Sequence, residues 1–185
     1  PVTHEMRVYD NIEVAVNNIG GVGENEITVT PVSLSPTFRK LYTEFVNFPG
    51  SPLDALPVVP GKQLIVCPDA AGAITEVNRL VDWRRRKGID ASYVTTTTTG
   101  PTATQIRNYI ASQYTSSNGQ LEFVTIVGDP NAAAIYNLPT EGSQLDNYYG
   151  TVGTGNPDPV PDLAVGRLPV NTDAELKTVR RPRIE

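Results

Sequence analysis

The sequence predicts an α/β fold in which helices flank an open, mostly parallel sheet. Residues 62–185 alternate short apolar runs with longer stretches of helical periodicity, the pattern of strands joined by crossover helices. With 185 residues, of which 39% are hydrophobic and 19% charged, the chain is large enough to bury a core. Its 16 prolines and 15 glycines predict many turns and at least one linker.

Three regions are expected along the chain. Residues 1–48 contain two alternating apolar runs separated by glycines, which predicts a β-hairpin, and then a helix that begins after Ser35 and ends near Phe48. Residues 49–61 contain four prolines and are expected to form an extended linker. Residues 62–185 are expected to form the α/β unit.

Local signals place the elements of this unit. Asp69 is a candidate N-cap for a first helix that ends at Gly88, and capping-box spacings begin two more helices at Thr102 and Thr172. The basic run 84–87 suits a helix C-terminus, and a partner-binding patch is the alternative. Strands are expected at 63–67, 91–97, 122–130, 148–152 and 162–168.

Composition excludes several classes of function. The formal net charge of −5 disfavours binding to nucleic acid. One cysteine, Cys67, and one histidine, His4, cannot build a disulfide framework or a Cys/His zinc site. A Cys–His nucleophile pair would need both of these residues, and His4 lies near the start of the chain. No run approaches the ~20 apolar residues of a membrane span, so none is expected.

Carboxylates suggest a cation site. Asp158 and Asp162 alternate with Val160 in the run DPVPD, so their side chains can point the same way with a carbonyl between them. Asp129, at the end of the third predicted strand, is expected nearby. Carboxylate and carbonyl oxygens suit Ca²⁺. The alternative is that these aspartates only form turns beside proline and glycine.

Several motifs, taken in order, resemble the first half of the catalytic region of the gingipain family of cysteine endopeptidases. They are DWRRRKG (82–88), PTATQIRNYI (101–110), VTIVGDP (124–130), DNYYGTV (146–152) and PDLAVGRLPV (161–170). Residues 7–14 and 38–48 are similar to the end of the pro-segment in that family. The resemblance implies a caspase-like fold with two subdomains side by side, of which residues 62–185 would be the first, subdomain A.

The resemblance implies that the chain is an N-terminal fragment of a peptidase that hydrolyses peptide bonds with a downstream Cys–His dyad. The family's His-Gly and cysteine motifs do not occur here, so the fragment is expected to be inactive. Cys67 matches a core position of the first strand, and His4 matches no catalytic motif. The implied partners are the second catalytic subdomain and the protein or peptide substrates of the complete enzyme. The implied location is extracellular or at the cell surface.

The family also binds structural calcium. Carried over by position, the implied ligands are Asp129, Asp158, the carbonyl of Val160, Asp162 in place of a family glutamate, and a carbonyl of Val152 or Gly153. The ion would neutralise the carboxylates and fix the loop.

Two other functions remain open from the residues alone. One is a non-catalytic binding or scaffold module with a flavodoxin-like sheet. The other is a small-ligand or phosphoacceptor domain that uses Asp129 at the strand edge, as other doubly wound folds do.

Overall fold

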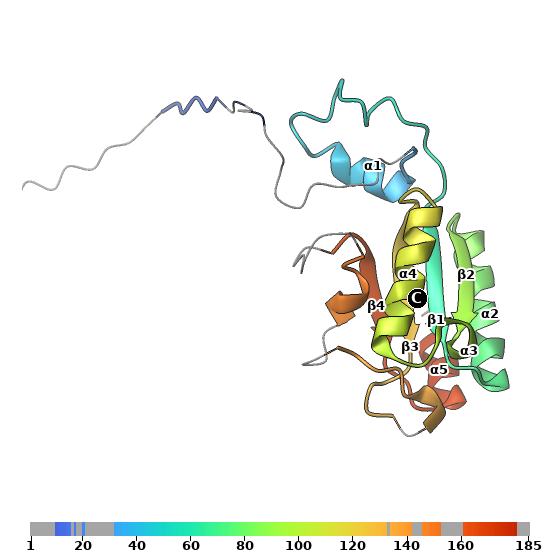
Figure 1. The fold of residues 1–185 in the computed structure, drawn as a ribbon. Helices are drawn as coiled ribbons and strands as arrows, with labels where there is room; N and C mark the ends of the chain where they lie inside the picture. The colour runs from blue at the N-terminus through green and yellow to red at the C-terminus, as the bar shows by residue number, and fades with distance from the viewer. Residues whose placement is uncertain are drawn as a thin grey trace, which may run out of the picture.

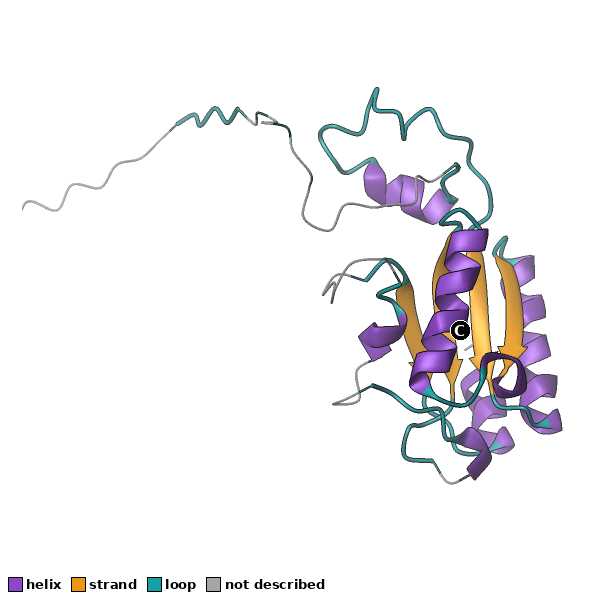
Figure 2. Cartoon of the chain, in the orientation of Figure 1, coloured by secondary structure: helices purple, strands orange, loops and turns teal. Residues whose placement is uncertain are grey.

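A computed structural model describes residues 10–15, 17, 20, 32–132, 134–141, 146–152 and 161–180. Four parallel strands form one open sheet in the order β2-β1-β3-β4, with helices on both faces (Figures 1 and 2). The predicted fold class is therefore confirmed. The strands are β1 (Lys62–Cys67), β2 (Asp90–Thr95), β3 (Leu121–Val127) and β4 (Ala164–Leu168). The helices are α1 (Pro36–Tyr42), α2 (Ala71–Arg86), α3 (Thr96–Thr99), α4 (Ala103–Ser116) and α5 (Asp173–Arg180), with 3₁₀ turns η1 (Ala134–Tyr136) and η2 (Asp146–Tyr149).

Strand residues alternate between two hydrophobic cores, one on each face of the sheet. Leu64, Val124 and Ile126 pack with Ile106 and Ile110 of α4 on one face. On the other face, strand residues pack with α2 and α5, and this core contains Ile65, Cys67, Val127, Val77 and Leu176. Because both faces are covered, the central strands are apolar throughout, as expected for a parallel sheet.

Local capping explains where α4 begins and where α2 ends. Thr102 and Gln105 form the predicted capping box of α4. Gly88 follows the end of α2 with a φ of 80°, a left-handed backbone conformation that favours glycine. Within the basic run, Arg84 and Lys87 lie over the ring of Trp83. The run forms the last turn and C-cap of α2, so its charges lie at the helix C-terminus as the structural interpretation expects.

Asp69 does not cap α2. The N-cap of α2 is Ala70, and the Asp69 carboxylate instead accepts a hydrogen bond from the hydroxyl of Thr97. The strand expected at 91–97 ends early, since β2 stops at Thr95 and residues 96–99 form the short helix α3. The sheet explains this, because Thr95 pairs with Cys67, the last residue of β1, and no partner strand extends further.

The expected strand at 148–152 is the 3₁₀ turn η2 followed by an irregular segment. Arg107 donates hydrogen bonds to the carbonyls of Tyr148, at 3.2 Å, and of Thr151. These carbonyls are therefore satisfied by a side chain, and the segment needs no strand partner.

Ser35 caps α1 as predicted, but the helix ends at Tyr42 and not near Phe48. Residues 49–56 fold into consecutive turns, so only 57–61 remain extended. Most of the expected hairpin lies outside the described residues. Among the described helices, none is long and apolar enough to cross a bilayer.

Candidate functional site

The carboxyl ends of β1 and β3 are where an open α/β sheet of this strand order ordinarily binds a ligand. Here the chain's own side chains fill that position. Ala132, Tyr136 and Leu138 are buried, and the hydroxyl of Tyr136 donates a 2.5 Å hydrogen bond to Asp173 at the start of α5. Burial raises the pKa of Tyr136, and the carboxylate of Asp173 raises it further. This edge of the sheet is packed as core.

Gly128 allows the chain to close over this edge. Its φ is 135°, and a Cβ at this position would clash with the carbonyl oxygen of Tyr136. The backbone N–H of Asp129 donates to the same carbonyl at 3.0 Å. Glycine is therefore required where β3 turns into residues 129–138, which we call the covering segment.

Asp129 forms a turn at this edge. Its Oδ1 accepts a 2.8 Å hydrogen bond from the backbone N–H of Asn131. Such a local bond is typical of aspartate in turns. Within the part of the chain that the structure describes, no three His, Cys, Asp or Glu side chains are grouped to hold a metal ion.

Cys67 is a core residue, as expected. It has no exposed surface and lies in the core between the sheet and α2. Burial raises the pKa of its thiol to about 12, and the charge of Asp69 adds to the shift. A nucleophilic thiol needs a lowered pKa and access to substrate, and Cys67 has neither.

Asp129 and Asp162 do not converge, so this expectation was wrong. Asp129 follows β3, whereas Asp162 precedes β4, and β3 and β4 run parallel with Phe123 opposite Ala164. The two carboxylates thus lie beyond opposite ends of the strand pair, whose four residue steps from Phe123 to Val127 alone span ~13 Å at ~3.3 Å per residue. One Ca²⁺ ion binds oxygens only ~2.5 Å away, so these two residues cannot share it.

Asp162 instead bonds to the backbone of residues 150–152. Its Oδ2 accepts a 2.9 Å hydrogen bond from the backbone N–H of Val152, and its own N–H donates to Gly150 at 2.8 Å. The other expected calcium ligands, Gly153, Asp158 and Val160, lie outside the described residues. A calcium site formed by Asp162 and these residues therefore stays a prediction, without Asp129.

Arg167 is a positioning residue that the sequence analysis missed. It pairs with Asp146 and donates from Nη1 to the carbonyls of Gly128, at 2.8 Å, and Leu138, at 3.0 Å. It therefore joins β4, the end of β3, the covering segment and η2. The sequence signal for this role is an arginine in the otherwise uncharged strand AVGRL. Arg167 lies two residues after Val165 and so shares the face of the sheet that α4 covers.

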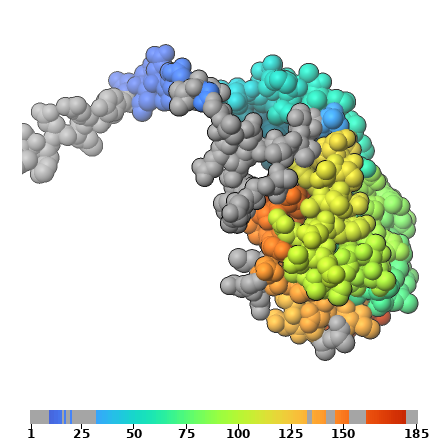
Figure 3. Space-filling view, in the orientation of Figure 1, coloured from blue at the N-terminus to red at the C-terminus, as the bar shows by residue number. Residues whose placement is uncertain are grey.

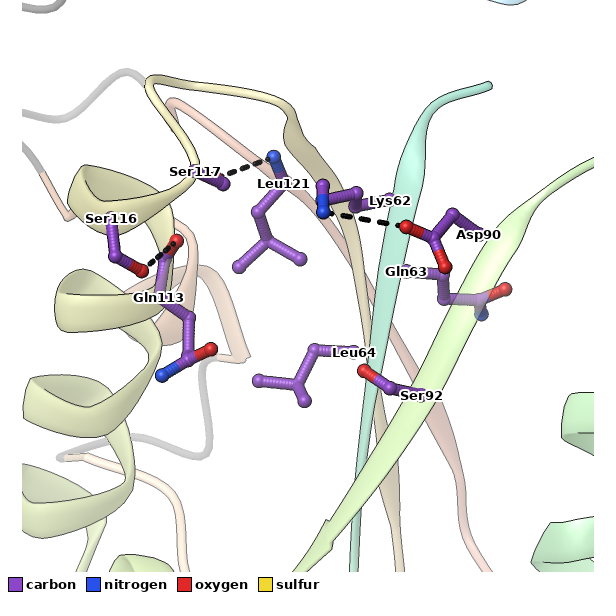
Figure 4. Close-up of a pocket in the computed structure, with 9 residues that line it drawn as sticks. All are labelled: Lys62, Gln63, Leu64, Asp90, Ser92, Gln113, Ser116, Ser117 and Leu121. Atoms are coloured by element: carbon purple, nitrogen blue, oxygen red, sulfur yellow. Dashed lines mark hydrogen bonds and ion pairs between the residues drawn. The ribbon is translucent and has the colours of Figure 1, made fainter. Parts of the chain in front are cut away.

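A small polar pocket lies at the opposite, amino end of the sheet (Figure 4). Leu64 and Leu121 line it together with polar side chains of β2 and α4, and the Lys62–Asp90 ion pair, at 3.3 Å, crosses one side. Its volume of about 180 Å³ is below the ~300 Å³ of typical ligand pockets. No residue pair in it has the geometry of a nucleophile and base.

Comparison with known sequences gives consistent matches. The chain is 25% identical to gingipain R2 of Porphyromonas gingivalis (strain W83) over 185 residues, which are 96% of this chain and 24% of that protein. It is also 25% identical to a gingipain R1 of Porphyromonas gingivalis, over 96% of this chain and 18% of that protein. The chain spans about a quarter or less of the length of these relatives.

Solved structures show the same fold. The complex of Porphyromonas gingivalis RgpB pro- and mature domains matches with a TM-score of 0.56 and 22% identity, over 65% of this chain and 27% of that one. The Arg-specific cysteine proteinase gingipain R (RGPB) matches with a TM-score of 0.53 and 21% identity, at the same coverage. The model of peptidase family C25 matches residues 58–181, two thirds of the sequence. The chain therefore belongs to peptidase family C25.

Proposed function

We propose that this chain is the first, supporting subdomain of a C25 cysteine endopeptidase together with the end of its pro-segment. In this proposal residues 1–48 belong to the pro-segment, 49–61 link it to the subdomain, and 62–185 form subdomain A. The histidine and cysteine that cleave peptide bonds would lie in a second subdomain of a longer polypeptide.

The burial of Cys67 carries this proposal. It is the one cysteine of the sequence, it has no exposed surface, and its thiol pKa is raised to about 12. In a cysteine peptidase, a thiolate attacks the scissile carbonyl while a histidine accepts and returns the proton. A chain whose single thiol stays protonated in the core can support such chemistry but cannot perform it.

The packed carboxyl edge argues against the small-ligand and phosphoacceptor alternative. Tyr136 is buried in the same core as Cys67 and Val127, the last residues of β1 and β3, and the carboxylate of Asp129 accepts a local hydrogen bond in its own turn. What remains for this unit is packing, positioning of loops and contact with another subdomain.

Two finer features belong to the same proposal. A calcium ion would be held in the 153–160 loop by Asp158, Asp162 and the carbonyls of Val160 and of Val152 or Gly153, and its chemistry would be the neutralisation of carboxylates. The complete protein would act outside the cell or at its surface on protein or peptide substrates.

A peptidase assay tests the proposal. The chain is incubated with fluorogenic peptides carrying arginine, lysine or apolar residues before the scissile bond, in parallel with Cys67→Ala. We expect no turnover by either protein. Turnover that the substitution abolishes would refute the proposal.

Sequencing the gene beyond Glu185 separates the peptidase from the scaffold module. A His-Gly motif and a cysteine motif within about one domain length, roughly one to two hundred residues, would support the peptidase. An open reading frame that stops without them would support the scaffold.

A further inference from the structure

Glu122 is the extra residue of a β-bulge between β1 and β3. Lys62 pairs with Leu121, but the next residue of β1, Gln63, pairs with Phe123. The extra residue of such a bulge is left out of the strand pairing, and its side chain is turned in a new direction. Here the Glu122 carboxylate lies against Gly61, where an added Cβ would clash with it, and close to Ser35.

Ser35 belongs to what we call the N-terminal segment, residues 32–48, which contains α1. This segment lies on the amino end of the α/β unit, next to the C-terminal end of α4 (Figures 1 and 3). Side chains join it to the start of β3. Gln120 donates a 3.0 Å hydrogen bond to the hydroxyl of Ser33, and the rings of Phe38 and Phe123 lie 6.0 Å apart. Glu122 stands between these two contacts in the sequence.

The backbone of the N-terminal segment is bonded elsewhere. The N–H of Leu34 donates to Pro57 at 3.0 Å, and its carbonyl accepts from Val59 at 2.9 Å. The contact with β3 described above is therefore made by side chains, so a change in one of them can change how firmly the segment docks.

Ser35 is both the N-cap of α1 and the neighbour of Glu122. Its Oγ accepts a 3.2 Å hydrogen bond from the backbone N–H of Phe38, which leaves the hydroxyl proton available for a second contact. The Ser35 side chain and the Glu122 carboxylate lie beside each other, since a Cβ added at Gly61 would contact both of them. The cap of the helix and the bulge of the sheet are therefore adjacent.

The Glu122 carboxyl is poorly solvated. It is half-buried, and its Oε2 is buried without a hydrogen-bond partner. Desolvation raises its pKa above the ordinary value of 4.5, and the polar groups of nearby Ser35 oppose the shift without cancelling it. The charged groups of the adjoining elements pair elsewhere, Arg39 of α1 with Asp54 and Lys62 of β1 with Asp90. No ion pair of the described residues compensates the charge of Glu122.

We propose that Glu122 is a pH-sensitive latch that holds the N-terminal segment on the sheet, firm when its carboxyl is protonated and loosened when it is ionised. Because the docked carboxyl binds its proton more tightly than a solvated one, docking is strongest below about pH 4.5 and weakens as pH rises through the raised value. The latch is a property of the fold and does not depend on peptidase activity.

Hydrogen exchange measured by NMR tests the latch. Protection factors of the α1 amides, corrected for intrinsic exchange, are compared between about pH 4.5 and pH 8 in the wild type and in Glu122→Gln. The amide mimics the protonated carboxyl. We expect wild-type protection to fall by roughly threefold or more over this range, and the variant to keep its low-pH protection throughout.

Glu44→Gln is the matched control, because Glu44 is exposed on the same segment. It should retain the wild-type pH dependence. Amides of β1 and β3 report whether each variant is folded. If Glu122→Gln does not fold, a ¹³C titration of the Glu122 carboxyl in the wild type decides. Coincidence of its midpoint with the loss of α1 protection supports the latch. A midpoint at the ordinary glutamate value, or α1 protection independent of pH, overturns it.

Discussion

The guanidinium of Arg167 and the carboxylate of Asp146 form a two-pronged ion pair at the β4 edge of the sheet. Nη2 lies 2.6 Å from Oδ1 and Nε lies 2.9 Å from Oδ2. The Arg167 side chain is only 9% exposed, and its Nη1 donates to two backbone carbonyls. Such bidentate pairs fix geometry as well as charge, so this residue determines how three chain segments meet beside β4.

Removing this guanidinium should be costly. Arg167→Ala leaves the Asp146 charge and the carbonyls of Gly128 and Leu138 without their donor. We expect the free energy of unfolding to fall by about 3 kcal/mol, measured by urea titration. Arg86→Ala, at an exposed position, is the control and should change it by less than about 0.5 kcal/mol. Equal losses in the two variants would contradict the positioning role.

The Cys67 thiol should not react with thiol reagents in the folded protein. An aromatic disulfide reagent at about pH 8 should titrate no thiol in native protein and one per chain in denaturant, because the residue has no exposed surface. One equivalent of fast reaction in the native state would show that the strand opens or that the thiol is accessible.

The same thiol should contribute to alkaline instability. Its folded pKa, about 12, lies above the 9.0 of an exposed thiol, so the native state binds more protons between these values. Its contribution to stability is complete below pH 9.0 and is lost as pH rises through about 12. Between about pH 8 and pH 10, the free energy of unfolding should therefore fall less in Cys67→Ala than in the wild type. Parallel pH profiles would contradict this.

The capping box of α4 should be worth a measurable stability. Thr102→Ala removes the hydroxyl that accepts from the backbone N–H of Gln105 at 3.3 Å. We expect a loss of about 1 kcal/mol in urea unfolding. Ser112→Ala, on the exposed side of the same helix, serves as the comparison and should stay within about 0.5 kcal/mol of the wild type.

The proposed calcium binding by Asp158 and Asp162 can be tested by thermal melting with calcium and then with chelator. Calcium should raise the midpoint of the wild type, because an ion that binds only the folded form stabilises it. Asp158→Asn should reduce that shift. Asp129→Asn, at the other end of the strand pair, should leave it intact. A midpoint unaffected by calcium, or a shift that depends on Asp129, would count against the site.

The sequence was sufficient for elements whose signals are local. The apolar runs of β1, β3 and β4 and the capping box at Thr102 each depend on a few neighbouring residues, and the structure confirms them. Family resemblance added the caspase-like class, which the solved structures support.

Predictions failed where contacts between distant residues decide the outcome. Asp69 looks like an N-cap, but the hydroxyl of Thr97 binds its carboxylate. Tyr148 and Thr151 look like strand residues, but Arg107 binds their carbonyls. The convergence of Asp129 with Asp162 failed because the direction of parallel strands sends the end of one and the start of the next to opposite edges. The bulge at Glu122 has no sequence signal, because it depends on the register between two strands.

The side chain of Tyr136 fills the carboxyl end of the sheet in this domain. Other doubly wound proteins bind a ligand at that end of the sheet, whereas here a side chain of the polypeptide itself is buried there. In the proposed peptidase, this filled end of the sheet would support the second subdomain by packing and would not bind a ligand of its own.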